Sequence, residues 1–246
     1  IEYLLVGLQG QSSWALAATA RTLLLIRKHR PDVIYSTGGA YSAHLAGYWL
    51  KKITGIKWIA EIHDPMVIAG SADNRNTRFM AKLEGLICRD ADLVWWFTEE
   101  ALNSARRRHP ELGNRGISIL PGVEPFRTDA KYQRGPQMII GHFGSLSDTR
   151  SLLPVVEAMD TLLTIQPEIR PEIRVHVYGG SIDARAAKEI TRRNLGDVFV
   201  CFGRLEKSTE TGKSGREQVV DLMHQVDWLL LVHGNIEDCR EYIPSK

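Results

Sequence analysis

Small, hydroxyl-bearing and cationic residues follow the apolar runs of this 246-residue chain. They form six short loops: Ser36-Thr37-Gly38-Gly39, His63-Asp64-Pro65, Gly144-Ser145-Leu146-Ser147, Gly179-Gly180-Ser181, Gly203-Arg204 and His233-Gly234-Asn235. Glycine lets backbone N–H groups approach a ligand closely, and arginine adds a charge that suits phosphate. Taken singly, each of these loops is more often an ordinary tight turn than part of a ligand site. Because so many of them follow strands, together they favour a ligand cleft between two domains.

The end of the chain repeats this chemistry beside a predicted helix start. The apolar run 228–232 predicts a buried strand, and His233-Gly234 follows it. Pro244-Ser245-Lys246 then carries residues typical of the first turn of a helix, where free N–H groups bind anions. We therefore expect a phosphate site near the C-terminus, in a second domain that continues past Lys246.

Composition indicates an ordinary globular protein of one large or two medium domains. Hydrophobic residues make up 43% of the chain and charged residues 24%, and the net charge of +2 gives no case for nucleic acid as a partner. Three widely spaced cysteines, Cys88, Cys201 and Cys239, favour a reducing compartment, and we expect a cytoplasmic location. No apolar run approaches the length of a membrane span.

Apolar strands alternate with amphipathic helices along the chain, which predicts parallel sheets flanked by helices. The expected strands are 3–6, 32–35, 57–62, 93–97, 117–120, 138–143, 173–178, 198–202 and 228–232. The expected helices are 12–29, 42–52, 77–89, one capped by Thr98, 149–165, one from Asp183, and 215–225. Residues 121–137 are rich in proline, glycine and charge and predict a linker. The fold class is thus α/β, with two Rossmann-like domains, 1–127 and 128–246, whose ligands sit at the carboxyl ends of the strands.

In order and spacing these segments resemble the retaining nucleotide-sugar glycosyltransferases of GT-B fold, the group 4-like family. The matching segments are PDVIYS (31–36), WIAEIHDP (58–65), ADLV (91–94), PGVE (121–124) with Phe126, GHFGSL (141–146), VYGG (177–180), FGR (202–204), VDWLL (226–230) and IPSK (243–246). The resemblance implies an acceptor-side domain that lacks its start and a donor-nucleotide domain that lacks its end. It also implies that residues 1–246 alone are inactive.

The resemblance further implies sugar transfer, with retention, from a nucleotide diphosphate to a glycan, lipid-linked or small-molecule acceptor, as in polysaccharide biosynthesis. No cofactor or metal ion is implied. His63, with Asp64 beside it, looks like the family's catalytic histidine that contacts the donor sugar. An alternative reading of His63 is an ordinary histidine at a strand end.

Ten residues are implied on the donor side. They are Gly144, Ser145, Arg150, Gly179, Gly203, Arg204, His233, Gly234, Ser245 and Lys246. In the family, an arginine or lysine after the first strand of this domain and a lysine some residues later hold the diphosphate. Ser145 stands at the first of these positions and Arg150 near the second, so the expected two-cation clamp is incomplete.

Several alternatives stay open. A nucleotide-sugar epimerase would share this architecture, and a non-catalytic homologue that binds a nucleotide or a partner protein would fit the departure at Ser145. Asp90-Ala91-Asp92 has the spacing of a metal-binding motif but lies at the wrong end of the predicted sheet. Arg106-Arg107-Arg108 predicts a solvated helix end, with contact to acidic lipid headgroups at a membrane surface as the alternative.

Overall fold

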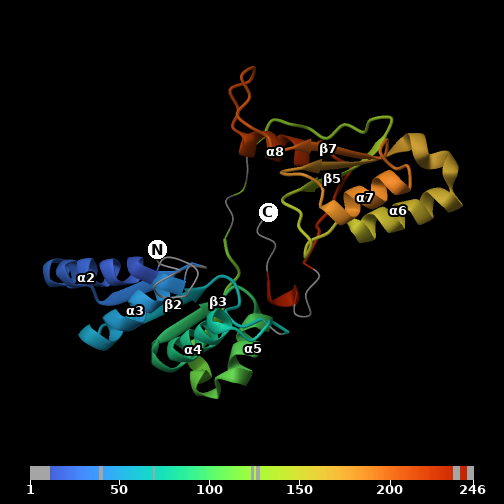
Figure 1. Ribbon diagram of the computed structural model, residues 1–246. Coiled ribbons are helices and arrows are strands. Elements are labelled where there is room, and N and C mark those ends of the chain that lie inside the picture. The colour runs from blue at the N-terminus through green and yellow to red at the C-terminus, as the bar shows by residue number, and fades with distance from the viewer. Residues whose placement is uncertain are drawn as a thin grey trace. The chain divides into compact units, whose positions relative to one another are not determined.

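The computed structural model describes residues 12–38, 41–68, 70–122, 125, 128–234 and 239–242. The chain divides near Gly122 into two compact units, and the short helix η3 (Cys239–Glu241) belongs with the first of them (Figure 1). The division falls inside the segment 121–137 that the sequence indicates as a linker. The expected strand 3–6 lies outside the described residues.

Unit 1 is built on a parallel four-stranded sheet. Its strands are β1 (Val33–Thr37), β2 (Lys57–Ile62), β3 (Leu93–Trp96) and β4 (Gly116–Ser118), which lie in that order. Its helices are α2 (Ser12–His29), α3 (Tyr41–Thr54), α4 (Arg75–Asp90), α5 (Glu99–Arg108) and η1 (Pro110–Arg115). Thr98 caps α5, as its sequence predicts, by accepting a hydrogen bond from the Ala101 N–H.

The core of unit 1 lies on one face of this sheet. Alternate strand residues such as Trp58 and Trp96 are fully buried there against Leu83, Ile87 and Leu102 from α4 and α5. The alternation of strand side chains places the remaining residues on the opposite face, and Tyr35 keeps half of its surface exposed there. Helix α4 begins two residues earlier than expected, because Asn74 and Thr77 form a reciprocal capping box.

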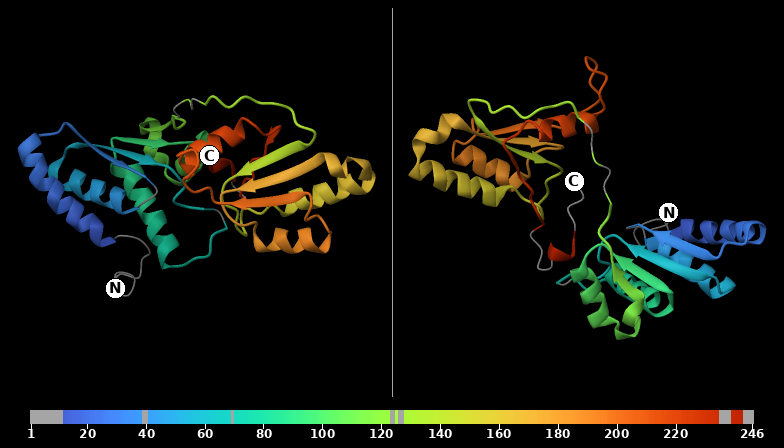
Figure 2. Two further views of the ribbon diagram at one scale, coloured as in Figure 1. Left: turned by 90° about the horizontal axis from the view of Figure 1, so that it is seen from above. Right: turned by 180° about the vertical axis from the view of Figure 1, so that it is seen from behind.

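Unit 2 repeats the design with strand order β7-β6-β5-β8. The strands are β5 (Met138–Phe143), β6 (Ile173–Tyr178), β7 (Phe199–Gly203) and β8 (Trp228–Leu229). The helices are α6 (Leu153–Ile165), η2 (Pro167–Glu172), α7 (Ala184–Arg192) and α8 (Gly215–Met223). Helices α6 and α7 lie together on one side of the sheet and α8 lies on the other (Figures 1 and 2). Both units therefore have the expected α/β architecture of a parallel sheet flanked by helices.

Two elements of unit 2 differ from the sequence expectation. Helix α6 begins at Leu153 rather than near residue 149, because Ser147 and Arg150 exchange backbone hydrogen bonds of 3.1 and 2.9 Å that close a turn. Strand β8 has two residues rather than five and is not buried, with Trp228 65% exposed. Among the described strands it ends the row, where it pairs with β5.

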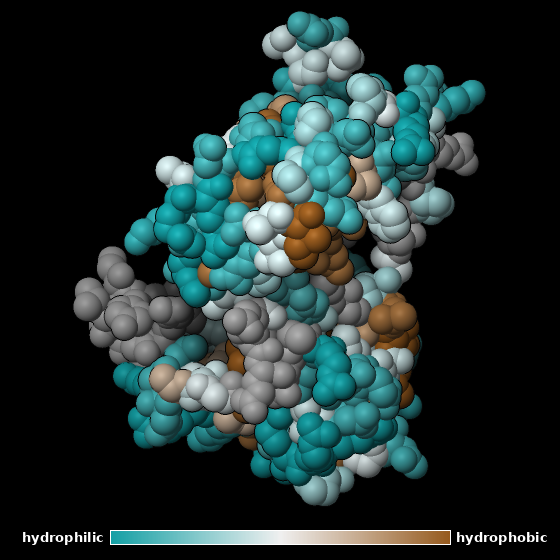
Figure 3. Space-filling model, turned by 90° about the vertical axis from the view of Figure 1, so that its right-hand side faces the viewer, coloured by the Kyte–Doolittle hydropathy of each residue, from teal (hydrophilic) through white to brown (hydrophobic). Residues whose placement is uncertain are grey.

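No helix in the described part of the chain is long and apolar enough to cross a membrane. The surface seen in Figure 3 is largely hydrophilic, with hydrophobic patches that are small and separate.

Candidate functional site

Three glycines form a continuous backbone row at the carboxyl edge of the sheet in unit 2. The Gly144 N–H donates to the Tyr178 carbonyl at 2.8 Å, and the Gly179 N–H donates to the Gly203 carbonyl at 2.7 Å. Gly179 has a φ of +117°, and a Cβ added there would stand 2.8 Å from the Gly144 oxygen. Residues from three loops that the sequence assigned to the donor side thus lie side by side.

An open cavity of about 610 Å³ adjoins this row. Its lining comes from the loops after β5, β6 and β7 and from the start of α8. The lining residues are Gly144, Ser145, Gly179, Arg204, Leu205, Glu206, Lys207, Gly215, Arg216 and Val219. Four of them are among the expected donor-side residues. The cations Lys207 and Arg216 are additions that sequence reasoning missed.

The start of α8, which carries Arg216, is packed tightly against the loop that carries Lys207. A Cβ on Gly215 would stand 2.0 Å from the Leu205 carbonyl oxygen, so only glycine fits at this position. Ser214 caps the helix, and the carboxylate of Glu217 accepts hydrogen bonds from the Ser214 N–H and hydroxyl, both at 2.7 Å. This Ser-x-x-Glu pattern is a helix-start signal that could have drawn attention to the neighbouring Arg216.

Charge in the cavity is predominantly positive. Arg204, Lys207 and Arg216 are exposed cations, and Glu206 is the single carboxylate among the lining residues. Arg204 and Glu206 approach to 3.8 Å, but both side chains are more than 80% exposed, so this ion pair is weak. The cavity is therefore suited to an anion whose oxygens can reach both glycine backbones and cationic side chains.

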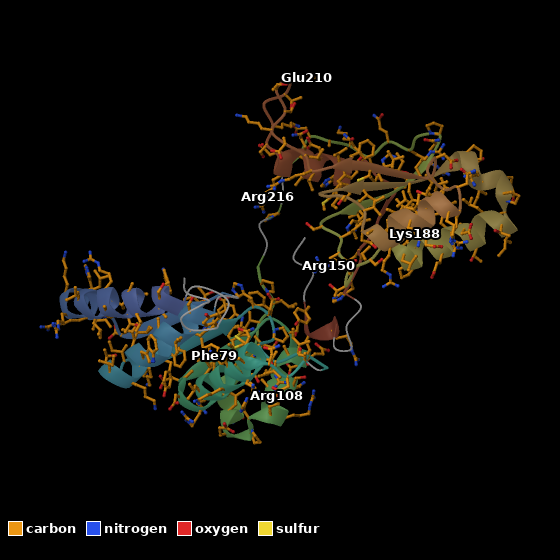
Figure 4. All side chains as sticks on the ribbon, viewed as in Figure 1. Phe79, Arg108, Arg150, Lys188, Glu210 and Arg216 are labelled. Carbon is orange, nitrogen blue, oxygen red and sulfur yellow. The ribbon has the colours of Figure 1, made fainter. Side chains whose placement is uncertain are left out.

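Other expected donor-side residues are not part of this cavity. Arg150 lies exposed in the turn between β5 and α6, outside the cavity lining (Figure 4). It precedes the start of α6, because that helix begins at Leu153 rather than near residue 149. His233 and Gly234 follow β8 and do not line the cavity either. Ser245 and Lys246 lie outside the described residues.

His63 lies in a polar cluster at the carboxyl edge of the unit 1 sheet. Its ring stacks on Phe97 with 4.5 Å between ring centroids and 20° between planes. Its Nε2 is 3.1 Å from the Thr37 hydroxyl oxygen and 3.5 Å from Oε1 of Glu61. The Glu61 carboxylate also accepts hydrogen bonds from the hydroxyls of Tyr35 and Thr37.

Parallel pairing brings this cluster together, because Thr37 and Glu61 are direct partners across β1 and β2. Burial raises the pKa of Glu61, but hydrogen bonds from Thr37 and Tyr35 outweigh burial and hold the pKa below its usual range. Glu61 is therefore a carboxylate at neutral pH. The signal for it in the sequence is a charged residue inside the apolar run 57–62. Asp64, the other expected catalytic residue, is exposed and stands outside the cluster.

A second layer of hydrogen bonds supports the loop after β1. The Trp58 indole N–H donates to the Ser36 hydroxyl at 2.8 Å, and Ser36 lies 3.0 Å from Nδ1 of His44. The Nε2 of His44 lies 3.1 Å from the Gly38 carbonyl, which can only accept. His44 is buried, and this desolvation lowers its pKa. A neutral His44 thus satisfies every partner and holds Gly38 in place.

Two other charged motifs have structural partners in unit 1. Asp90 pairs with Lys52 at 2.6 Å and Asp92 pairs with Lys51 at 2.7 Å. The predicted solvated helix end is only partly correct: Arg106 donates to the Gly116 carbonyl, and Arg108 makes two hydrogen bonds to the fully buried Glu84. Within the described ranges, no group of three or more His, Cys, Asp or Glu residues could hold a metal ion.

Comparison with known proteins gives one family and several solved structures. Residues 3–115 match the family described as glycosyl transferase 4-like domain. No curated protein matches the chain by sequence.

Three solved structures illustrate the likeness. S. aureus TarM, in complex with fondaparinux, α-GlcNAc-glycerol and UDP, is 15% identical with a TM-score of 0.53, over 76% of this chain and 36% of that one. OtsA without ligand is 14% identical with a TM-score of 0.60, over 95% and 60% of the two chains. A trehalose-6-phosphate structure from E. coli, bound with UDP-2-fluoro glucose, is 15% identical with a TM-score of 0.56, over 90% and 57%.

At these identities the likeness shows a shared fold alone. It confirms the expected α/β fold with two Rossmann-like units. The chain spans between about a third and three-fifths of the length of these structures.

Proposed function

Because residues 3–115 belong to the glycosyl transferase 4-like domain family, we propose that the protein transfers a sugar, with retention, from a nucleotide diphosphate donor to a hydroxyl-bearing acceptor. In this proposal unit 2 binds the nucleotide diphosphate and unit 1 supplies His63 at the reacting sugar. The acceptor is a glycan, a lipid-linked sugar or a small molecule.

The observation that carries the proposal is the glycine-lined, cationic cavity of unit 2. Gly144 and Gly179 let the backbone approach a ligand where a side chain would block it. Arg204, Lys207 and Arg216 add three positive charges around the same space. A diphosphate is a multiply charged anion with many acceptor oxygens, and charge-assisted hydrogen bonds from such groups are among the stronger ones in proteins.

These cations also account for the departure at Ser145. An arginine or lysine at that position is what the resemblance leads one to expect on the diphosphate. We propose that Lys207 and Arg216, which reach the cavity from the β7–α8 side, neutralise the diphosphate in its place. The charge that develops on the leaving diphosphate would then be stabilised by protein cations and N–H groups that are already positioned.

The solved structures are consistent with a nucleotide-sugar donor. S. aureus TarM was crystallised with UDP, and the E. coli structure with UDP-2-fluoro glucose. Both bind their ligands in proteins that share this fold, and they make uridine diphosphate the first nucleotide to test on this chain.

The test is calorimetric titration of the chain with UDP, GDP, ADP and inorganic pyrophosphate. We expect one nucleoside diphosphate to bind, and Lys207→Ala and Arg216→Ala each to weaken it by about tenfold, because a lost charge-assisted hydrogen bond costs roughly 1.5 kcal/mol or more. Lys188→Ala is the matched control, since Lys188 is an exposed cation of α7 outside the cavity lining (Figure 4). Failure of every diphosphate to bind, or equal binding by all variants, would overturn the proposed donor site.

Product analysis tests the reaction itself. Incubation of the full-length protein with the nucleotide sugar that binds, plus candidate acceptors, should yield a glycoside with the donor's anomeric configuration, as read by NMR. An epimerised nucleotide sugar formed without acceptor would contradict transfer and support the epimerase alternative.

A further inference from the structure

The imidazole of His63 makes all its observed polar contacts through one nitrogen. Nε2 faces the Thr37 hydroxyl oxygen at 3.1 Å and Oε1 of Glu61 at 3.5 Å. Among the described residues none makes a hydrogen bond to Nδ1, and the His63 side chain is 37% exposed. Stacking on Phe97 fixes the plane of the ring, so Nδ1 is the polar atom that remains for a ligand.

The hydrogens of the cluster can be assigned one by one. Thr37 has a single hydroxyl hydrogen, which it donates to Oε2 of Glu61. Tyr35 donates its own hydroxyl hydrogen to the same oxygen. Oε1 of the carboxylate is therefore left for His63, and the Thr37 oxygen can only accept from it. Both groups near Nε2 are acceptors, so Nε2 must carry the proton.

We infer that Glu61 and Thr37 hold His63 with a proton on Nε2, so that in the neutral form of the ring Nδ1 accepts a hydrogen bond from a hydroxyl group of the sugar substrate. The identity of that hydroxyl donor rests on the proposed function, whereas the tautomer follows from this cluster alone. Glu61 is then a positioning residue that acts through His63. Tyr35 donates to the other carboxylate oxygen, Oε2, and so helps to hold the carboxylate in place.

Replacement of Glu61 by glutamine gives a sharp expectation. The amide is nearly isosteric, but it has one acceptor oxygen and one donor nitrogen where the carboxylate has two acceptors. The hydroxyls of Tyr35 and Thr37 need the oxygen, which turns the amide N–H group toward Nε2. Nε2 must then become an acceptor, and the proton moves to Nδ1. Glu61→Gln should therefore reverse the tautomer and turn the ligand-facing nitrogen from acceptor into donor.

The first measurement is two-dimensional ¹⁵N–¹H NMR of the ¹⁵N-labelled 246-residue chain, which distinguishes protonated from unprotonated ring nitrogens. The pH should be near 8.5, about two units above the ordinary histidine pKa of about 6.5. His63→Gln identifies the His63 signals. We expect Nε2–H in the parent chain, Nδ1–H in Glu61→Gln, and no change in the control Glu99→Gln, whose carboxylate is 59% exposed.

Thr37→Val leaves the Glu61 carboxylate in place, so Nε2 of His63 should stay protonated. This variant controls for a movement of the proton that is caused by a disturbed fold rather than by loss of the carboxylate. A parent chain with its proton on Nδ1, or a Glu61→Gln chain that keeps it on Nε2, would overturn the assignment.

The second measurement separates this inference from the proposed function. In the full-length protein, Glu61→Gln should lower kcat for transfer by tenfold or more and leave the Kd for the nucleoside diphosphate unchanged, because the diphosphate cavity is built by unit 2. Unaltered kcat with a reversed tautomer would overturn the role of Nδ1 toward the sugar. A reversed tautomer in a full-length protein that transfers no sugar would contradict the proposed function and leave the positioning of His63 standing.

Discussion

Gly179 lies with its Cα directly against the peptide of Gly144, so that a Cβ on Gly179 would stand 2.8 Å from the Gly144 oxygen and 3.0 Å from its carbonyl carbon. The contact joins the loops after β6 and β5 at the edge where the proposed diphosphate site lies. Both partners are backbone atoms, so neither can swing away as a long side chain would.

Gly179→Ala should therefore damage both the fold and the site. Alanine at a φ of +117° is strained and its methyl group collides with Gly144, so we expect a loss of about 1–3 kcal/mol in the free energy of unfolding. Urea denaturation measures the loss, and calorimetry should show weaker diphosphate binding. Gly180→Ala is the control, because a Cβ there meets no atom within 4 Å. Equal stability of the two variants would show that the Gly144 loop moves freely.

Largely apolar runs predict three strands to the residue: Lys57–Ile62, Met138–Phe143 and Ile173–Tyr178. Each of these strands pairs with a neighbour on both sides, and the whole predicted run is part of the strand. The run 228–232 carries the same signal, yet β8 stops at Leu229. What differs is its position at the end of the row of described strands, and that position depends on contacts with β5 that a local pattern does not encode.

The same distinction holds for the candidate site. Glycines that follow strands are visible in the sequence, and Gly144, Gly179 and Gly203 do form one edge. The place of Lys207 and Arg216 at the cavity could not be predicted from the sequence, because it depends on the packing of Leu205 against Gly215. Glu61 is visible as a charge in an apolar strand, but its partner Thr37 is fixed by the register between β1 and β2.

The buried carboxylate of Glu84 gives a stability prediction. Arg108 donates to its two oxygens at 2.8 and 3.1 Å, and His109 lies 3.2 Å away. Arg108→Ala should cost about 3 kcal/mol of unfolding free energy, because it leaves a buried charge without its main partner. Arg89→Ala should cost less than about 1 kcal/mol, since the Arg89 side chain is 55% exposed.

Replacement of both partners tests the reason for that cost. The double variant Glu84→Leu with Arg108→Met removes the charge as well as its partner and should recover most of the stability lost in Arg108→Ala. A double variant as unstable as Arg108→Ala would show that shape, rather than an uncompensated charge, dominates at this position.

The cysteines should differ sharply in reactivity. Burial, with Glu84 and Glu111 nearby, raises the pKa of Cys88 to about 12, so about one thiol in ten thousand is ionised at pH 8. Cys201 is exposed. Brief treatment with iodoacetamide followed by peptide mapping should find Cys201 modified and Cys88 intact. Modification of Cys88 at a comparable rate in the native chain would mean that the core of unit 1 opens readily.

His44 should make the stability of unit 1 depend on pH. Burial lowers its pKa in the folded chain, whereas an unfolded chain titrates near the ordinary value of about 6.5. Above that value both states are neutral and His44 adds no pH dependence. As the pH falls below that ordinary value, the unfolded state binds a proton on His44 and the folded state does not. The free energy of unfolding therefore decreases until the pH falls below the lowered pKa of His44 in the folded chain.

Protonated His44 would also lose an acceptor, because Nδ1 could no longer receive the Ser36 hydroxyl hydrogen. His44→Gln removes the titrating group and keeps a donor for the Gly38 carbonyl. Urea denaturation at pH 8 and pH 5.5 should show a larger loss of unfolding free energy in the parent chain than in His44→Gln. The comparison cancels His176, whose pKa burial also lowers and which is present in both chains. Equal losses in the two chains would mean that His44 accepts its proton in the folded state, and the hydrogen-bond assignment around Ser36 and Gly38 would then be wrong.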